Sequence, residues 1–118
     1  EPYCYGQFTE GKASPHAGRS HVHWLTGTAS TVMVGCVEGI LVIRPDLGGI
    51  KIAPSIPKEW KALEIWKDFR GKKLHIQIEN PEGKETGCKK LTVNGAELPG
   101  NYIPAEVLTE TTEIVLTM

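Results

Sequence analysis

This sequence has no long apolar run, no cluster of basic residues and no closely spaced pair of cysteines. A helix that crosses a bilayer needs about 18 consecutive apolar residues, and Glu38 interrupts the longest candidate. The 13 Lys and Arg residues are mixed with 14 Asp and Glu residues, which gives a net charge of −1. Nucleic-acid and membrane-surface binding need clustered Lys and Arg, so the composition argues against both partners. The first residues also lack the basic and apolar regions of a signal peptide.

The three cysteines, Cys4, Cys36 and Cys88, are widely and irregularly spaced. Without a Cys-x-x-Cys pair, the sequence indicates neither a structural zinc site nor a redox motif. Cys36 lies in an apolar segment, where a cysteine usually behaves as a small buried hydrophobic residue. These features predict a reducing compartment, namely the cytoplasm, and no metal.

The sequence pattern changes near residue 47 within a chain of 118 residues, a length that suits one domain. Residues 1–24 show neither helical nor alternating periodicity and predict an irregular, folded loop. Residues 27–41 predict a helix that begins at Thr26 or Gly27 and ends near Arg44-Pro45, because the residue before a proline is disfavoured in a helix.

The predicted helix is apolar or small on nearly every side, with Glu38 as its one charged residue between positions 29 and 41. Such a helix must be buried on nearly all sides, and Gly35 and Gly39 would let a neighbouring helix approach closely. The rest of the chain offers no second helix, so a helical barrel or a close homo-oligomer would have to supply the partners. The valines leave a buried strand as the alternative for this segment.

Residues 48–118 show the short alternating runs and turns of an antiparallel β-domain, either a sheet or a small sandwich. An Asn94-Gly95 pair between apolar residues predicts a hairpin, and Trp60 and Trp66 are expected to pack against the sheet. Strands are predicted over residues 50–53, 63–70, 73–80, 91–98 (as a hairpin) and 111–117.

Thr26 and Gly27 form a small polar turn directly before the apolar helix. The start of a helix leaves backbone N–H groups and the positive end of the helix dipole available, which suits an anion such as phosphate. An ordinary helix cap is the alternative interpretation.

A series of short motifs in a fixed order resembles the C-terminal end of the inverting sugar phosphorylases of glycoside hydrolase family 94, which include cellobiose, cellodextrin and chitobiose phosphorylases. The resemblance is dense over residues 1–60 and thin afterwards. The motifs are Glu1-Pro2-Tyr3, Tyr5-Gly6-Gln7-Phe8, Gly18-Arg19-Ser20, Trp24-Leu25-Thr26-Gly27-Thr28-Ala29, Gly39-Ile40-Leu41, Ile43-Arg44-Pro45-Asp46 and Pro54-Ser55-Ile56-Pro57-Lys58-Glu59-Trp60.

The resemblance implies an α+β fragment of a longer enzyme. Residues 1–47 would be the last loop and the buried helix of a catalytic (α/α) barrel, and residues 48–118 a small C-terminal antiparallel β-domain. The family cleaves a β-linked disaccharide or oligosaccharide with inorganic phosphate and inverts the anomeric centre to give an α-sugar 1-phosphate. Phosphate is the co-substrate and no cofactor is expected; the parent enzyme is expected to be a homo-oligomer.

The resemblance also assigns residues to the phosphate site, namely Thr26 and Gly27. The family's general acid is an Asp of the barrel, and no carboxylate of this chain matches its motif, so the fragment alone is expected to be inactive. Val42 stands where the family usually has Gly, which predicts a stiffer exit from the helix.

Arg19, His21 and His23 form a polar group upstream of the helix and are candidates for a loop that borders the sugar or phosphate site. A solvated or packed loop with hydrogen-bonded histidines is the alternative. Two or three histidines without Cys or carboxylate ligands make a poor metal signature. For the whole chain, the alternative to a phosphorylase segment is a non-catalytic β-domain, which either binds carbohydrate through exposed aromatic residues or is purely structural.

Overall fold

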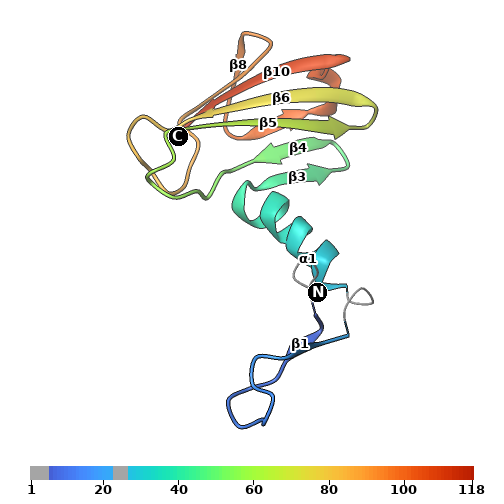
Figure 1. Ribbon diagram of the computed structural model, residues 1–118. Coiled ribbons are helices and arrows are strands. Elements are labelled where there is room, and N and C mark those ends of the chain that lie inside the picture. Colours follow the sequence, from blue (N-terminus) through green and yellow to red (C-terminus); the bar gives the residue numbers. More distant parts are fainter. Residues whose placement is uncertain (1–5, 23–26) are drawn as a thin grey trace. The chain divides into compact units, whose positions relative to one another are not determined.

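The computed structural model describes residues 6–22 and 27–118. The chain divides into an N-terminal unit, residues 1–36, and a β-unit, residues 37–118. A short hairpin lies in the N-terminal unit, and the longer strands lie in the β-unit (Figure 1).

The hairpin of the N-terminal unit pairs β1 (Phe8–Thr9) with β2 (Ser20–His21) in antiparallel fashion. Its loop is closed by backbone hydrogen bonds: Glu10 N–H donates to the Arg19 carbonyl at 2.9 Å and Gly18 N–H donates to the Glu10 carbonyl at 2.9 Å. The segment predicted as an irregular loop therefore contains an ordered hairpin. Strands of two residues are too short to show an alternating pattern.

The predicted helix is confirmed: α1 (Thr28–Val34) begins after Gly27 and continues as a π-helix, η1 (Gly35–Ile40). This rules out the buried strand. Neither helical segment has a buried residue, which agrees with the expectation that this chain lacks a second helix to enclose it. The prediction that Cys36 is buried is wrong for the described part of the chain, where Cys36 is exposed.

The helix ends at Ile40, and two residues later Val42 adopts a positive φ of 47°. This left-handed backbone conformation is costly for a β-branched residue and easy for glycine. It gives a physical reason for a glycine at this position in the resembled family. Strand β3 (Ile43–Asp46) follows at once, so Pro45 lies within a strand and the helix ends earlier than predicted.

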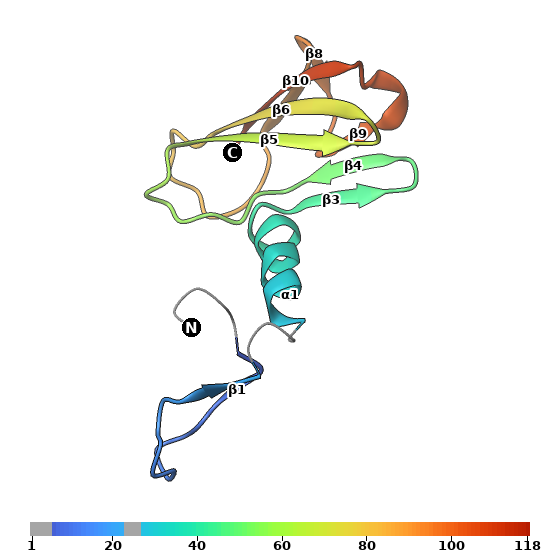
Figure 2. The same cartoon turned by 45° about the vertical axis from the view of Figure 1, so that its right-hand side comes forward.

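The β-unit contains two sheets (Figure 2). The smaller has the strand order β3-β4-β9, with β4 (Gly49–Ile52) in the centre and β9 (Tyr102–Pro104) at one edge. The larger has the order β5-β6-β10-β7-β8. Its strands are β5 (Ala62–Phe69), β6 (Lys72–Glu79), β7 (Lys90–Val93), β8 (Ala96–Leu98) and β10 (Thr111–Thr117), and a 3₁₀ turn, η2 (Ala105–Val107), precedes the last of them.

The strand pairs are antiparallel as predicted, with one exception: β10 lies parallel to β6. Strand β9 was not predicted, because its three residues carry no alternation. Both sheets contribute to a single apolar core, so the β-unit is a small sandwich. The fully buried core side chains are Ile43, Ile50, Ile52, Leu74, Ile76, Leu91, Ile103, Ile114 and Leu116.

Three local features fix the strand connections. The predicted hairpin turn is confirmed, with positive φ at both Asn94 (49°) and Gly95 (83°), the conformation that joins two strands most tightly. Asn80 is fully buried after β6; its Nδ2 donates to the carbonyls of Trp60 and Lys84 at 3.1 and 2.7 Å. Gly49 allows β4 to approach β9, since a Cβ there would lie 2.1 Å from the carbonyl oxygen of Ile103.

Candidate functional site

Gly27 occupies the N-cap position of α1. Its carbonyl oxygen accepts hydrogen bonds from Thr31 N–H at 3.0 Å, Thr31 Oγ1 at 3.0 Å and Ser30 Oγ at 2.9 Å. The carbonyl is thus engaged by the helix, and the backbone N–H is the polar group that Gly27 can offer to a ligand. Gly27 is exposed, and a Cβ built on it meets no atom of residues 6–22 and 28–118 beyond its chain neighbour within 4 Å. Thr26, the other predicted phosphate ligand, lies outside the described residues.

His21 lies on β2 and forms a hydrogen bond with Glu10, with 2.5 Å between His21 Nε2 and Glu10 Oε1. The Ser14 hydroxyl donates to the other oxygen of Glu10. Hydrogen bonds from Ser14 and from His21 hold the pKa of the Glu10 carboxyl below its ordinary value. The ring of Phe8 stacks on His21, with centroids 4.9 Å apart. This set of contacts fixes the orientation of the His21 ring.

Glu10 was missed by sequence reasoning. It lies 11 residues from His21, and only the closure of the hairpin brings the two side chains together. Arg19 lies on the same hairpin, shortly before His21 in the sequence, and its side chain is exposed. His23 lies outside the described residues.

The β-unit carries a second polar cluster that the sequence did not reveal. His75 of β6 lies between two carboxylates: Nε2 is 2.6 Å from Glu64 Oε1 of β5, and Nδ1 is 2.6 Å from Glu113 Oε2 of β10. Because a carboxylate only accepts hydrogen bonds, both ring nitrogens must donate, which requires protonated His75. Burial opposes this charge, but the hydrogen bonds to Glu64 and Glu113 outweigh it and raise the pKa of His75 above its ordinary value.

Trp66 stacks on His75, with ring centroids 3.9 Å apart and planes 7° from parallel. Trp66 remains 63% exposed and Trp60 45% exposed. Neither tryptophan is buried in the core, although Trp66 packs against His75 on the face of the sheet. Trp66 lies on the outward face of β5, opposite the alternating residues that reach the core.

In the part of the chain that the structure describes, no three His, Cys, Asp or Glu side chains are grouped so as to hold a metal ion. Over the same residues, no helix is both long enough and apolar enough to cross a bilayer.

Comparison with known proteins bears on the hairpin and the helix directly. The family model of the glycosyl hydrolase 94 superfamily, catalytic domain, matches residues 1–42. Those residues contain β1, β2 and the whole helical segment. These residues belong to this superfamily.

Curated relatives extend the similarity into the β-unit. N,N'-diacetylchitobiose phosphorylase of Vibrio proteolyticus is 36% identical over 88% of this chain and 13% of its own length. Solabiose phosphorylase of Paenibacillus borealis is 32% identical over 97% of this chain and 15% of its own length. A 3-O-beta-D-glucopyranosyl-beta-D-glucuronide phosphorylase of the same species is 33% identical over 79% of this chain and 12% of its own length.

The chain therefore spans about one seventh of the length of these relatives. Their names describe phosphorylases of different sugars, yet the identities lie within a few per cent of one another. The overall similarity supports phosphorolysis at the level of the family and does not select a sugar.

Proposed function

We propose that this chain is the C-terminal segment of an inverting glycoside phosphorylase, which cleaves a β-linked disaccharide or oligosaccharide with inorganic phosphate and releases an α-sugar 1-phosphate. The observation that carries the proposal is the match to the family, together with relatives that are phosphorylases by name. The helix supports it as well, because several of its apolar residues, Met33, Val34 and Ile40, are exposed in the described part of this chain. Residues 1–47 would complete a catalytic (α/α) barrel, and the β-unit would stabilise it.

Within this enzyme, Thr26 and Gly27 bind the phosphate. Thr26 donates a hydroxyl hydrogen bond, and Gly27 donates its backbone N–H without a Cβ in the way. The start of the helix adds partial positive charge close to the anion. Space around Gly27 and the engagement of its carbonyl by the helix are consistent with this role.

The hairpin borders the same site through Arg19 and His21, and the proposal includes His23, which lies outside the described residues, on the basis of its sequence position alone. Arg19 supplies positive charge to the sugar or phosphate, and Glu10 holds the ring of His21 in place. No carboxylate of the chain is assigned as general acid. In an inverting reaction the acid protonates the leaving oxygen while phosphate attacks the opposite face of the anomeric carbon. The parent enzyme would supply that acid, and phosphate is the co-substrate without a further cofactor.

The test is Gly27→Ala, made in the full-length enzyme that contains this chain. Gly27 has a helical φ of −71° and open space around it, so alanine should leave the fold intact and obstruct only an approaching phosphate. We expect the KM for phosphate to rise about tenfold or more, as when a hydrogen bond to a charged group is lost, and the KM for the sugar to stay constant. Thr26→Ala should act in the same direction.

Thr111→Ala, an exposed threonine on β10, serves as the matched control. Phosphate kinetics that respond equally to Gly27→Ala and Thr111→Ala, or to neither, would contradict the assignment of the phosphate site. An enzyme that forms no sugar 1-phosphate from any β-linked disaccharide would overturn the proposed activity itself.

A further inference from the structure

An exposed tryptophan is held rigidly on the outer face of the five-stranded sheet. Trp66 is 63% exposed, although it lies within an eight-residue strand. His75 lies on the same face but is only 8% exposed, because the indole ring of Trp66 covers it. One face of the indole is thus occupied by His75, and the other is open.

The Trp66 ring stacks on a histidine that is itself held in place. His75 is held at both ring nitrogens by Glu64 and Glu113 at 2.6 Å, and Trp66 stacks on the protonated ring, an arrangement that adds cation–π attraction. A side chain fixed before binding loses little conformational entropy when a ligand arrives. This favours a binding surface over a merely solvated aromatic residue.

Hydrogen-bond acceptors lie on the same face of the sheet as the stacked pair of Trp66 and His75. Glu64 and Glu113 each use one carboxylate oxygen for His75, and their side chains are 61% and 53% exposed. Gln77 lies next to His75 on the same face of β6 and pairs with Glu64 across the strands. An open aromatic plane bordered by a few polar groups is the usual composition of a small-molecule site.

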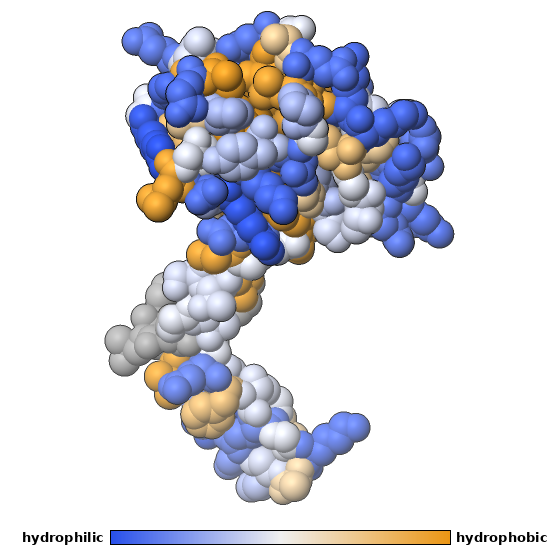
Figure 3. Space-filling model, turned by 180° about the vertical axis from the view of Figure 1, so that it is seen from behind, coloured by the Kyte–Doolittle hydropathy of each residue, from blue (hydrophilic) through white to orange (hydrophobic). Residues whose placement is uncertain are grey.

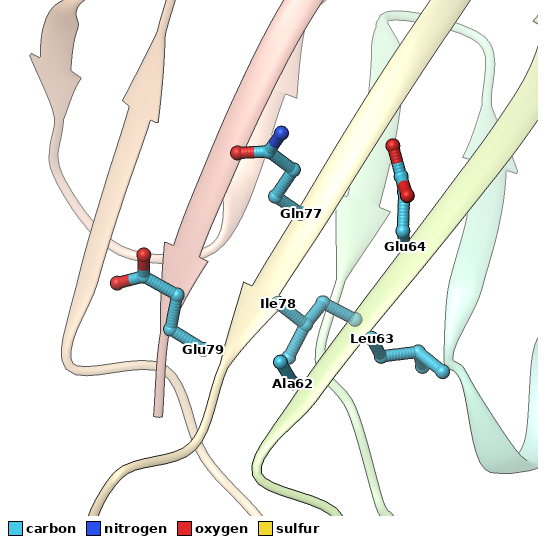
Figure 4. A pocket seen from close by; sticks show the side chains of 6 residues that line it. All are labelled: Ala62, Leu63, Glu64, Gln77, Ile78 and Glu79. Atoms are coloured by element: carbon cyan, nitrogen blue, oxygen red, sulfur yellow. The ribbon is translucent and has the colours of Figure 1, made fainter.

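A hollow lies along the same two strands (Figure 4), and its lining residue Glu64 is two residues before Trp66 on β5. Its volume is about 340 Å³, at the lower end of the range for ligand sites, roughly 300–1,000 Å³. Glu64, Gln77 and Glu79 project on one side of it, and Ala62 has too short a side chain to fill it (Figure 4). The distance along β5 from Trp66 to Ala62 is about 13 Å at ~3.3 Å per residue, more than one sugar ring.

The charge of this face limits which ligands can bind to it. On the outer face of β5, β6 and β10 lie four carboxylates, Glu64, Asp68, Glu79 and Glu113, against the cations Lys73 and His75. Figure 3 shows the molecule from behind the view of Figure 1; on that side, hydrophilic residues cover much of the β-unit, with smaller apolar patches between them. A phosphate or an acidic sugar would be repelled by the four carboxylates, whereas neutral hydroxyl groups can donate hydrogen bonds to them.

We propose that the Trp66 face, defined as Trp66, Glu64, Glu113, Gln77 and the hollow over Ala62, binds a neutral β-linked oligosaccharide. A β-linked chain of gluco-configured rings is extended and flat, with axial C–H groups on the ring faces and equatorial hydroxyls along the edges. One ring stacks its C–H face on the open side of Trp66, and its hydroxyls donate to Glu64, while Glu113 holds His75 under the indole. The next ring enters the hollow, within reach of Gln77 and Glu79. The choice of a β-linked ligand rests on the proposed function. The Trp66 face, however, contains no residue of the proposed phosphate site.

The test is a titration of the 118-residue chain with cellotetraose, in which binding is measured by calorimetry and by tryptophan fluorescence. We expect binding, a loss of affinity of at least about tenfold in Trp66→Ala, and little change in Trp60→Ala, the matched control with an exposed tryptophan outside the sheet. Glu64→Gln and Glu113→Gln should weaken binding less than Trp66→Ala. Maltotetraose, which is α-linked and curved, should bind more weakly than cellotetraose.

Circular dichroism and the urea midpoint of each variant show whether it is folded, and Trp66→Phe retains a stacking ring in case Trp66→Ala does not fold. The proposal is overturned by absence of cellotetraose binding, by equal losses in Trp66→Ala and Trp60→Ala, or by equal binding of maltotetraose. Self-association of the chain that Trp66→Ala abolishes would assign the face to a second copy and would also overturn it. Because the titration needs no phosphorolysis, its failure leaves the proposed activity unaffected, and a failure of that activity leaves the titration result unaffected.

Discussion

At the scale of single residues, the β-unit shows how a charged group is kept on a sheet surface. His75 is nearly inaccessible, yet its two ring nitrogens both donate to carboxylates. The carboxylates come from the neighbouring strands on each side, Glu64 on β5 and Glu113 on β10. A cation held in this way ties three strands together and stacks under Trp66.

The raised pKa of His75 predicts a pH-dependent stability of the β-unit. Protons bind more tightly to the folded than to the unfolded chain, so this contribution is complete below the ordinary histidine pKa of about 6.5. It is lost as the pH rises through the higher pKa of folded His75. The groups around the ring are Glu64 and Trp66 from β5, Glu113 from β10, and Lys73 and Gln77 from its own strand.

The measurement is the urea midpoint of the wild type and of His75→Gln between pH 5 and pH 9. Glutamine retains a neutral hydrogen bond and does not titrate, so the difference between the two proteins isolates His75 from the other histidines. We expect the difference to be largest at the acidic end and to shrink as the pH rises. A difference that is constant with pH would show that the charge of His75 has no role in stability.

At the scale of secondary-structure elements, the junction between the helix and β3 is strained. Val42 has φ = 47°, and its carbonyl accepts a hydrogen bond from Ala53 N–H at 3.1 Å. That bond and the start of β3 hold the residue in the left-handed region. The strain arises from side-chain branching at a position whose backbone suits glycine.

Val42→Gly is therefore expected to stabilise the 118-residue chain. Removing the left-handed penalty gains about 1–2 kcal/mol, and the greater backbone freedom of glycine in the unfolded chain costs about 0.5–1 kcal/mol. The net gain of up to about 1 kcal/mol is measurable by urea unfolding. Val42→Ala, which keeps the Cβ, should gain less; a glycine variant less stable than the alanine variant would contradict the interpretation.

At the scale of the whole molecule, the helix stands out because several of its apolar side chains are exposed to water. Met33 and Val34 are 66% and 53% exposed and Ile40 is 45% exposed, and Gly35 and Gly39 have no neighbouring atoms within 4 Å of a built Cβ. An apolar helix without a covering surface is costly in water. This agrees with the proposal that the segment packs into the barrel of a longer enzyme.

Met33→Lys distinguishes a covered helix from a free one. We expect the substitution to leave the Tm of the 118-residue chain nearly unchanged, because Met33 already faces water there. In the full-length enzyme it should lower the free energy of unfolding by about 2–5 kcal/mol, as for loss of a buried methionine. Thr111→Lys, at the exposed first residue of β10, is the control. A full-length enzyme that tolerates both substitutions equally would mean that the helix is not covered at Met33.

The sequence determined the features that depend on neighbours along the chain. Alternation at every second residue predicted β5, β6 and β10, the Asn94-Gly95 pair predicted the tight hairpin, and the apolar run predicted the helix from Gly27. The order of short motifs identified the family, because such motifs depend on residue identity and spacing alone. Each of these signals lies within a few residues, where backbone geometry and side-chain period are set locally.

The tertiary structure decided what depends on residues far apart. His75 meets Glu64 and Glu113 from positions 11 and 38 residues away, and β10 lies parallel to β6; local period does not specify which strand becomes a neighbour. Trp66 faces outward and Glu10 pairs with His21 for the same reason. Strand register and the burial of the core fix these contacts, and the chain shows them only when the sheets and the hairpin are formed.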